Sequence, residues 1–371
     1  MKTKKIYLAL PFLGFILWSC TSQNEASSNS LKTSINSSAQ SLTTAMTSIK
    51  STTGYQLLNV SGTSSSSSVS ANMVKTPVSA FDSTYSSILL TDISGIYDYK
   101  AANYRKWSPA LLRFFVKTAD NSDMIVRLPE SKVKNPWDLM RYSSSDTTLV
   151  NNYVIDVSKY AYSFNRYLGW NYNLASNISV RGTSVGDLTI QSSNNKTNGY
   201  HFRSGFAFAN GYTASASYTS GDTITSIYNI SKASQTLYEE KYTAIKTSST
   251  SKHRETEYSL TIGNVQVVRE GGPNSLDSAK VYVDGVLQLH SKVKFIDVTS
   301  TSSSADSTET TITNHKRELQ ITFDDGTSTT INALLGSTIS DIDTLFTAIR
   351  QTYFATNIVD YIAWDLYINK Q

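Results

Sequence analysis

The hydrophobic pattern is helical early in the chain. From residue 31 to residue 50, apolar side chains recur at intervals of three, four or seven, at Leu31, Ile35, Leu42, Met46 and Ile49. This spacing places them on one face of a helix. Serine and threonine in the same segment lower its helix propensity. We therefore expect an amphipathic helix over residues 31–50 that depends on packing against another element.

From about residue 81, apolar and polar residues alternate, as they do in strands that have one face in water. We predict a half-buried antiparallel strand at each such run. The runs are Tyr160, Tyr162 and Phe164; Tyr200, Phe202, Phe206 and Phe208; Leu287, Leu289, Val293 and Phe295; and Leu319, Ile321 and Phe323.

Tight turns are predicted next to these runs, at Asn210–Gly211, Asp284–Gly285 and Asp325–Gly326. Such pairs tolerate the positive backbone angles of a type I′ hairpin. Residues 111–119 and 124–128 flank a polar segment of hairpin length, so we predict a further hairpin there.

The C-terminal part contains one clear helix and one ambiguous segment. Ser340 and Asp343 resemble a capping box, and an apolar stripe follows at Ile342, Leu345, Phe346 and Ile349. Residues 358–368 fit both a strand and a helix. Their β-branched and aromatic content favours a strand.

Strands in succession with few helices between them favour a mainly β (α+β) fold. We expect a large antiparallel meander, as a sandwich or a curved half-barrel, with an N-terminal and a C-terminal helix packed on it. We assign residues 77–371 to this β domain, which could subdivide near residue 176. The sequence shows neither a βαβ rhythm nor a clear internal repeat.

The first 19 residues have the pattern of a signal peptide. Three lysines precede the apolar run Ile6–Trp18, which is too short to cross a bilayer. The stretch Leu17-Trp18-Ser19-Cys20 resembles the lipobox of bacterial lipoproteins, although Trp18 departs from the small residue usual there. The resemblance implies cleavage before Cys20 and attachment of lipid, including palmitate, to that cysteine.

Residues 20–76 would then hold the lipid anchor, a Ser/Thr-rich tether with the low-complexity stretch Ser61–Val69, and the helix at 31–50. This style is loosely similar to that of lipoproteins of Bacteroidota. Ser22 stands where an aspartate would resemble an inner-membrane retention signal. We therefore expect a cell-envelope protein anchored to the outer membrane, with its periplasmic or surface orientation open.

Charge excludes one class of partner. Without residues 1–19 the chain has 30 basic and 29 acidic residues, and no basic run with interleaved aromatics. We therefore expect no binding to nucleic acid. Cys20 is the only cysteine, so an internal disulfide is impossible.

Catalytic motifs are weak. Gly182-Thr183-Ser184-Val185-Gly186 fits the G-x-S-x-G nucleophile elbow, but the residues after it resemble a strand rather than the required helix. We interpret it as a hairpin turn. Two Ser-x-x-Lys pairs, Ser131 with Lys134 and Ser249 with Lys252, lack the later K-T-G element.

The remaining titratable residues also give no constellation. The four histidines His201, His253, His290 and His315 are far apart. Glu239 and Glu240 would point to opposite faces of a strand, which makes them a poor pair for glycoside hydrolysis. We predict no metal, no cofactor and no enzymatic activity.

Aromatic residues are the remaining clue, with 23 tyrosines and 5 tryptophans in the chain. Tyr167, Trp170 and Tyr172 lie near a predicted strand end and are the candidate ligand-binding residues, since exposed rings stack on sugars and suit protein interfaces. The alternative is that these rings belong to the core and the sheet.

Three functions remain open. The first is a non-enzymatic envelope lipoprotein that binds a glycan or an envelope protein, or has a structural role. The second is a carrier of lipid or another hydrophobic molecule, with an apolar cavity between a curved sheet and its helices. The third, a hydrolase, would need a pocket with convergent titratable groups.

Overall fold

The computed structural model describes residues 28–59, 85–100, 114–133, 148–247, 254–271, 279–302, 312–323 and 325–370. The predicted signal peptide, Cys20, the stretch Ser61–Val69, and Lys134, Ser249, Lys252 and His253 lie outside these residues.

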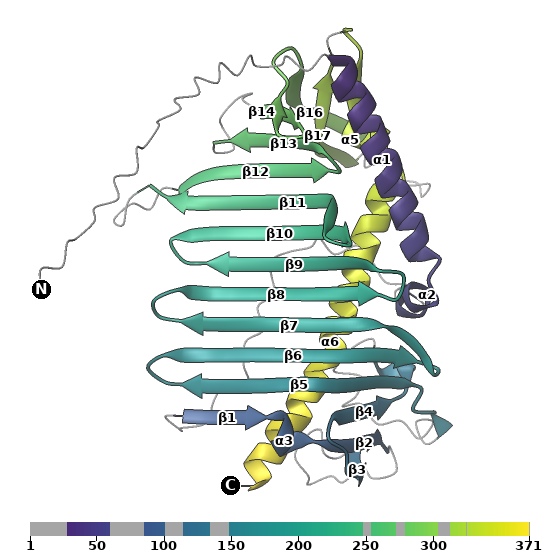
Figure 1. The fold of residues 1–371 in the computed structure, drawn as a ribbon, viewed down its shortest axis with the longest axis vertical. Coiled ribbons are helices and arrows are strands. Elements are labelled where there is room, and N and C mark those ends of the chain that lie inside the picture. The colour runs from purple at the N-terminus through teal and green to yellow at the C-terminus, as the bar shows by residue number, and fades with distance from the viewer. Residues whose placement is uncertain are drawn as a thin grey trace, which may run out of the picture.

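One open, almost entirely antiparallel sheet dominates the molecule (Figure 1). The predicted mainly β fold, with a large antiparallel sheet and an N-terminal and a C-terminal helix, is therefore found, and the sheet is single rather than paired in a sandwich. Its main ladder runs, neighbour by neighbour, through β17 (Ile312–Thr322), β16 (Lys292–Ser302), β14 (Ala279–Val283), β13 (Val265–Glu270), β12 (Arg254–Ile262), β11 (Gln235–Lys246), β10 (Thr223–Lys232), β9 (Tyr212–Ser220), β8 (Gly199–Phe208), β7 (Thr183–Asn195), β6 (Gly169–Val180) and β5 (Tyr153–Asn165). Residue 176 lies inside β6, paired on both sides, and the sheet has no break there.

The ladder divides beyond β5. One half of β5 pairs with β1 (Tyr85–Leu89) and the other half with β4 (Met124–Leu128). The short strands β15 (Val286–Leu287) and β18 (Ser328–Thr330) extend β14 and β17.

The predicted hairpin of residues 111–119 and 124–128 is wrong. β3 (Phe115–Ala119) and β4 do not pair, because β2 (Gly95–Tyr99) lies between them, antiparallel to β3 and parallel to β4. A local pattern shows two strands and a turn, but it cannot show that an earlier segment pairs with both.

The turns divide into two kinds. Asp284 and Gly285 both have positive φ, as the predicted type I′ turn requires. Next to Asn210, only Gly211 does, so the hairpin between β8 and β9 has a different turn. Gly326 closes the turn before β18 by donating from its backbone N–H to the Phe323 carbonyl, 3.0 Å away.

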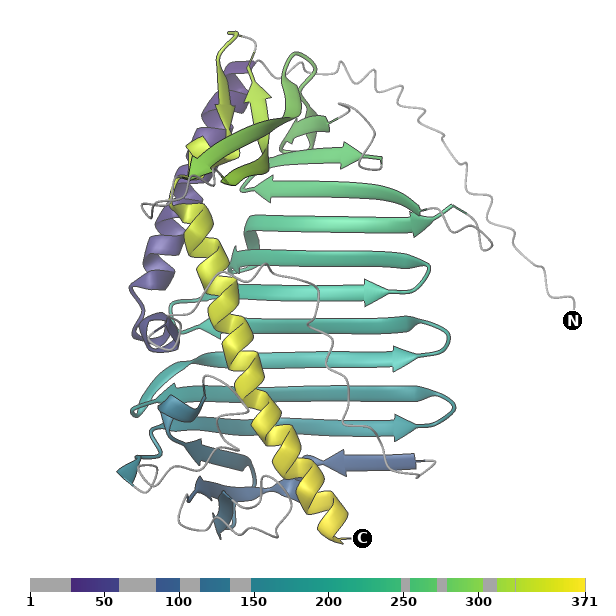
Figure 2. The same ribbon diagram turned by 180° about the vertical axis from the view of Figure 1, so that it is seen from behind.

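Two long helices cover the sheet. α6 (Thr338–Lys370) crosses one face diagonally, as Figure 2 shows, and α1 (Ser28–Lys50) contacts β11 to β14 and α6. The predicted apolar stripe of residues 31–50 is confirmed, since all five of its side chains are buried. The shorter helices are α2 (Thr53–Asn59), α3 (Leu90–Ile93), α5 (Ile331–Leu335) and the 3₁₀ turn η2 (Glu130–Lys132).

The strand predicted at residues 358–368 is wrong, because this segment is the last part of α6. Ile358, Val359, Ile362 and Ala363 are all buried, and their spacing is that of one helix face. Packing of this face against the sheet outweighs the strand propensity of the β-branched residues. Among the described helices, none is both long enough and apolar enough to cross a membrane.

Candidate functional site

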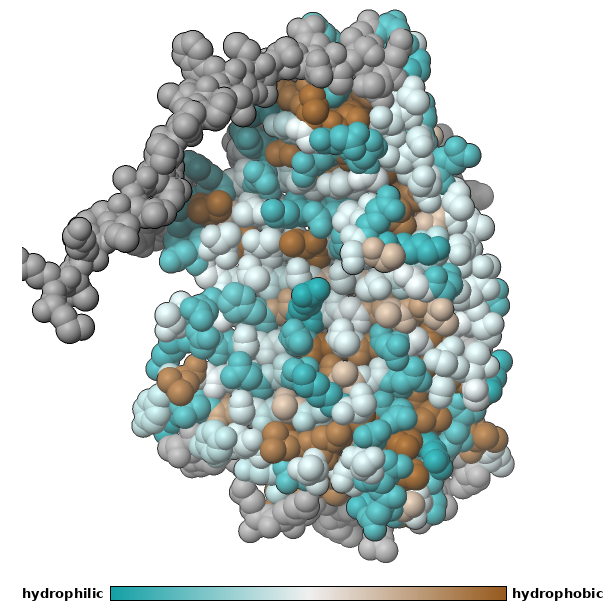
Figure 3. All heavy atoms as spheres, viewed as in Figure 1, coloured by the Kyte–Doolittle hydropathy of each residue, from teal (hydrophilic) through white to brown (hydrophobic). Residues whose placement is uncertain are grey.

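The two faces of the sheet differ in chemistry. Even-numbered residues of β5, β6 and β8 near their shared turns, such as Tyr162, Tyr172 and Phe202, point toward α6 and are buried. Their odd-numbered neighbours form the face that no described helix covers, which we call the open face. Figure 3 shows that its surface is mainly hydrophilic, with separate hydrophobic spots.

Mostly polar side chains form two aligned rows across the open face, because the register of six strands puts them opposite one another. We call these the groove rows. The first contains Ser87, Ser163, Asn171, Ser193, His201 and Thr219, and the second contains Leu89, Ala161, Asn173, Gln191, Arg203 and Ser217.

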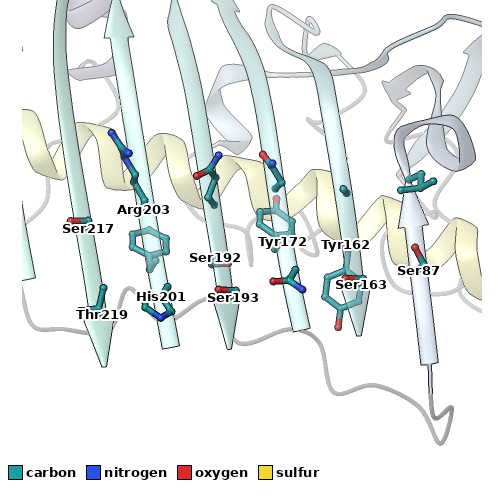
Figure 4. A pocket seen from close by; sticks show the side chains of 16 residues that line it. Ser87, Tyr162, Ser163, Tyr172, Ser192, Ser193, His201, Arg203, Ser217 and Thr219 are labelled. Atoms are coloured by element: carbon teal, nitrogen blue, oxygen red, sulfur yellow. The ribbon is translucent and has the colours of Figure 1, made fainter. Parts of the chain in front are cut away.

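The groove rows line an open groove of about 740 Å³. Figure 4 shows members of these rows on successive strands, with α6 behind the sheet, and also labels Tyr162, Tyr172 and Ser192, neighbours of the rows on the same strands that contribute to the lining. Serine and alanine at 161, 163, 193 and 217 are short, which leaves room above the backbone. Hydroxyl, amide and guanidinium groups supply donors and acceptors along the whole groove.

Positive charge is confined to one part of the groove. Arg203 is exposed, and no hydrogen bond or ion pair holds its guanidinium within the described part of the chain. His201 Nε2 lies 3.0 Å from the Asn198 carbonyl oxygen. None of the described residues that line the groove is acidic.

Exposed rings lie beside the groove at one corner. Tyr85 is 60% exposed and pairs with Asn165, the residue that begins the β5–β6 turn. That turn carries Tyr167, which is 67% exposed, and Asn165 Oδ1 accepts hydrogen bonds from the backbone N–H groups of Tyr167 (2.9 Å) and Leu168 (3.1 Å). A planar ligand that leaves the groove here meets apolar surface.

The structure does not bring the three predicted aromatic residues together at the surface. Tyr167 is exposed, but Tyr172 is only 6% exposed and packs edge-on against Tyr160, with ring centroids 5.7 Å apart. Trp170 is half-buried on the same helix-covered face, 5.9 Å from the ring of Tyr200. Strand alternation gives the physical reason, since even-numbered residues of β6 point to the core.

The sequence patterns did not single out the groove residues between these aromatics. The signal was present in the same strands, because most odd-numbered positions between residues 159 and 219 are polar or small. The apolar face of each strand gives the stronger pattern and hides the composition of the other face.

The G-x-S-x-G motif lies in the hairpin between β6 and β7, as predicted. Arg181 and Gly182 form a tight turn with positive φ, and Ser184 follows on β7, where Asn177 Nδ2 donates to its Oγ at 3.2 Å. Ser131 lies in η2 and His290 in the loop before β16. Within the described residues, no group of three or more potential metal ligands occurs.

Glu239 and Glu240 point to opposite faces of β11. Glu239 accepts a hydrogen bond from Asn229 Nδ2 (3.4 Å) on the open face. Glu240 lies beneath the helices and accepts from the hydroxyls of Tyr238 (3.2 Å) and Tyr258 (3.1 Å). Burial, with the negative charge of Glu240, raises the pKa of both tyrosines, so they remain neutral donors.

The side of the sheet under α6 is packed. Tyr228 contacts Phe346 of α6, with centroids 5.3 Å apart, and Tyr162 contacts Trp364 at 5.1 Å. Burial, followed by the charge of Asp360, raises the pKa of Tyr162 to about 12. The arrangement fits a structural core between helix and sheet.

Comparisons with protein-family models, with curated proteins and with solved structures find no match to this chain.

Proposed function

We propose that the protein is a non-enzymatic lipoprotein of the cell envelope that binds a glycan in the groove of its open face. The observation that carries this proposal is the pair of groove rows, in which neutral hydroxyl or amide groups recur on five of six neighbouring strands. A polyhydroxylated ligand exchanges hydrogen bonds with such groups along its length, and the rings of Tyr85 and Tyr167 offer a stacking surface at one end.

The groove is tested by blocking it. We expect Ser193→Trp to fill its centre and to abolish binding on an array of bacterial and host glycans. Thr261→Trp is the matched control, because it adds the same ring to a hydroxyl residue of the open face on β12, outside the groove. Equal glycan binding by wild type and Ser193→Trp would contradict the proposed site.

Anchoring through Cys20 is a separate part of the proposal. We expect the protein to incorporate labelled palmitate in a bacterial host and to fractionate with the outer membrane. Cys20→Ser should remove both properties without changing glycan binding. Palmitate incorporation that persists in Cys20→Ser would show that the lipobox interpretation is mistaken.

The carrier hypothesis has less support. A carrier needs an unfilled apolar cavity, and side chains of α6 fill the space over β5 and β10. Mass spectrometry of the natively purified protein separates the two proposals. A co-purifying lipid favours the carrier, whereas a protein partner captured through the open face favours a protein-binding or structural role.

A further inference from the structure

The groove is built by two copies of one hairpin. The copies are residues 163–173 and 193–203. Each begins with a serine, has an asparagine at the start of its turn and a glycine at the end of the turn, and continues into the second strand. The corresponding positions, offset by 30 residues, are Ser163 and Ser193, Asn165 and Asn195, Arg166 and Lys196, Gly169 and Gly199, Asn171 and His201, and Asn173 and Arg203.

The two turns have the same internal bonding. Asn195 Oδ1 accepts from the backbone N–H groups of Thr197 and Asn198, as Asn165 Oδ1 does in the first turn. Gly169 and Gly199 both have positive φ, at +107° and +74°. The hairpins β5–β6 and β7–β8 therefore present equivalent side chains two strands apart, or about 10 Å at the usual strand spacing.

The two copies differ in charge at the groove. The first hairpin offers the neutral amides Asn171 and Asn173, and the second offers His201 and Arg203 at the same places. Arg203 lies between Gln191 and Ser217 in its row, so no acid neutralises it there. Among the six strands that form the groove rows, β8 is thus the one with basic side chains, and the other five offer neutral side chains.

We propose that the groove binds a linear acidic polysaccharide in extended conformation, with its chain running across the strands. The carboxylate or sulfate of one sugar would face Arg203 and His201 on β8, and the hydroxyl groups of sugars over the first hairpin would exchange hydrogen bonds with Asn171 and Asn173. This inference rests on the proposed function and names its ligand class. The separation of about 10 Å between the two hairpins is comparable to the length of two sugar residues in an extended chain.

The distribution of basic residues in the groove favours an acidic polysaccharide over a nucleic-acid strand. Such a strand carries a phosphate on every unit, and so more charges per length than a polymer of alternating acidic and neutral sugars, which would call for basic residues on several strands of the groove. Only the second hairpin has them in the groove.

The test uses full-length protein in detergent and hyaluronan oligosaccharides, in which acidic and neutral sugars alternate. We expect calorimetric affinity to rise with length until both hairpins are covered. Reduction of the carboxyl groups should weaken binding about tenfold or more, since hydrogen bonds to charged groups are the strong ones. Added salt should weaken binding of the acidic form only.

The decisive variant is His201→Asn with Arg203→Asn, which gives the second hairpin the residues of the first. It should lose the preference for the acidic oligosaccharide and keep its affinity for the carboxyl-reduced one. Lys294→Asn, which removes a positive charge from exposed β16, should behave as wild type.

The outcomes distinguish the two levels of proposal. Groove-dependent binding of neutral glycans, with no effect of the double substitution, would overturn the acidic ligand and leave the glycan-binding function. Failure of every glycan to bind would overturn both. Nucleic acid binding that competes at the groove would overturn the choice of ligand class.

Discussion

Gly169 and Gly199 show how single residues fix the groove. A Cβ at either glycine would lie 1.9 Å from a backbone carbonyl oxygen, that of Asn194 or Ser220. Such an overlap can be relieved only by moving the backbone. The two turns therefore hold the strands at the spacing on which the groove rows depend.

Gly199→Ala should destabilise the protein by about 3 kcal/mol, because it adds this overlap to the cost of a left-handed backbone. Gly211→Ala is the matched control, since its φ of +82° is similar and no atom lies within 4 Å of the place that a Cβ would occupy. It should cost about 1 kcal/mol. Urea unfolding measures both, and equal losses would mean that the close approach has no energetic weight.

Helices and strands were predicted correctly where the local hydrophobic pattern agrees with the packing of the segment in the fold. The helix at 31–50 and the strands at 160–164, 200–208 and 319–322 follow from their apolar spacing. The run from Leu287 to Phe295 is not one strand, because it divides between β15 and β16, with Leu289 exposed between them. Residues 358–368 were predicted wrongly, because their apolar residues fit both the helical period and the strand period. Packing against the sheet determines that the segment is helical. The hairpin at 111–128 failed for a related reason, since β2 intervenes from an earlier part of the chain.

Ile362→Ala in α6 should cost about 2–4 kcal/mol, because its side chain is fully buried against the sheet. Ile368→Ala removes the same atoms from a side chain that is 45% exposed on the same helix. It should change stability by no more than about 0.5 kcal/mol. Urea midpoints compare the two variants, and similar losses would contradict the packing of this helix face.

At the scale of the whole molecule, two ion pairs connect α1 with C-terminal segments. Lys32 Nζ lies 2.8 Å from Asp325 Oδ2, and Lys50 Nζ lies 2.7 Å from Asp341 Oδ1. Hydrogen bonds from Lys32 and Thr327 lower the pKa of Asp325 to about 2. This folded-state pKa is below the unfolded value, so the contribution is present above the unfolded value and is lost as pH falls through about 2.

We therefore expect hydrogen exchange at the start of α1 to increase as pH approaches 2, after correction for the intrinsic exchange rate. Asp325→Asn should show the faster exchange already at neutral pH. Asp120→Asn, which removes the exposed pair with Lys117 on β3, serves as the control. Unchanged protection of α1 in Asp325→Asn would show that this pair does not hold the helix.

The repeated hairpin was the main feature hidden from the sequence. Its two copies share only a serine, an asparagine and a glycine in identical form, which a serine-rich chain obscures. Pairing in the sheet makes the correspondence visible, because it aligns positions whose side chains differ. The lipobox, which the described residues do not include, remains a prediction from sequence.

Two contacts of α6 relate the length of the helix to the width of the sheet. Phe346 touches Tyr228 on β10 and Trp364 touches Tyr162 on β5, so 18 helical residues accompany five strand spacings. These lengths agree, at about 27 Å of helix and about 24 Å of sheet. A chain that gained another hairpin in this region would need about two further turns of helix to keep both ends in contact. Duplication of the groove unit and growth of the C-terminal helix are thus expected to be inherited together.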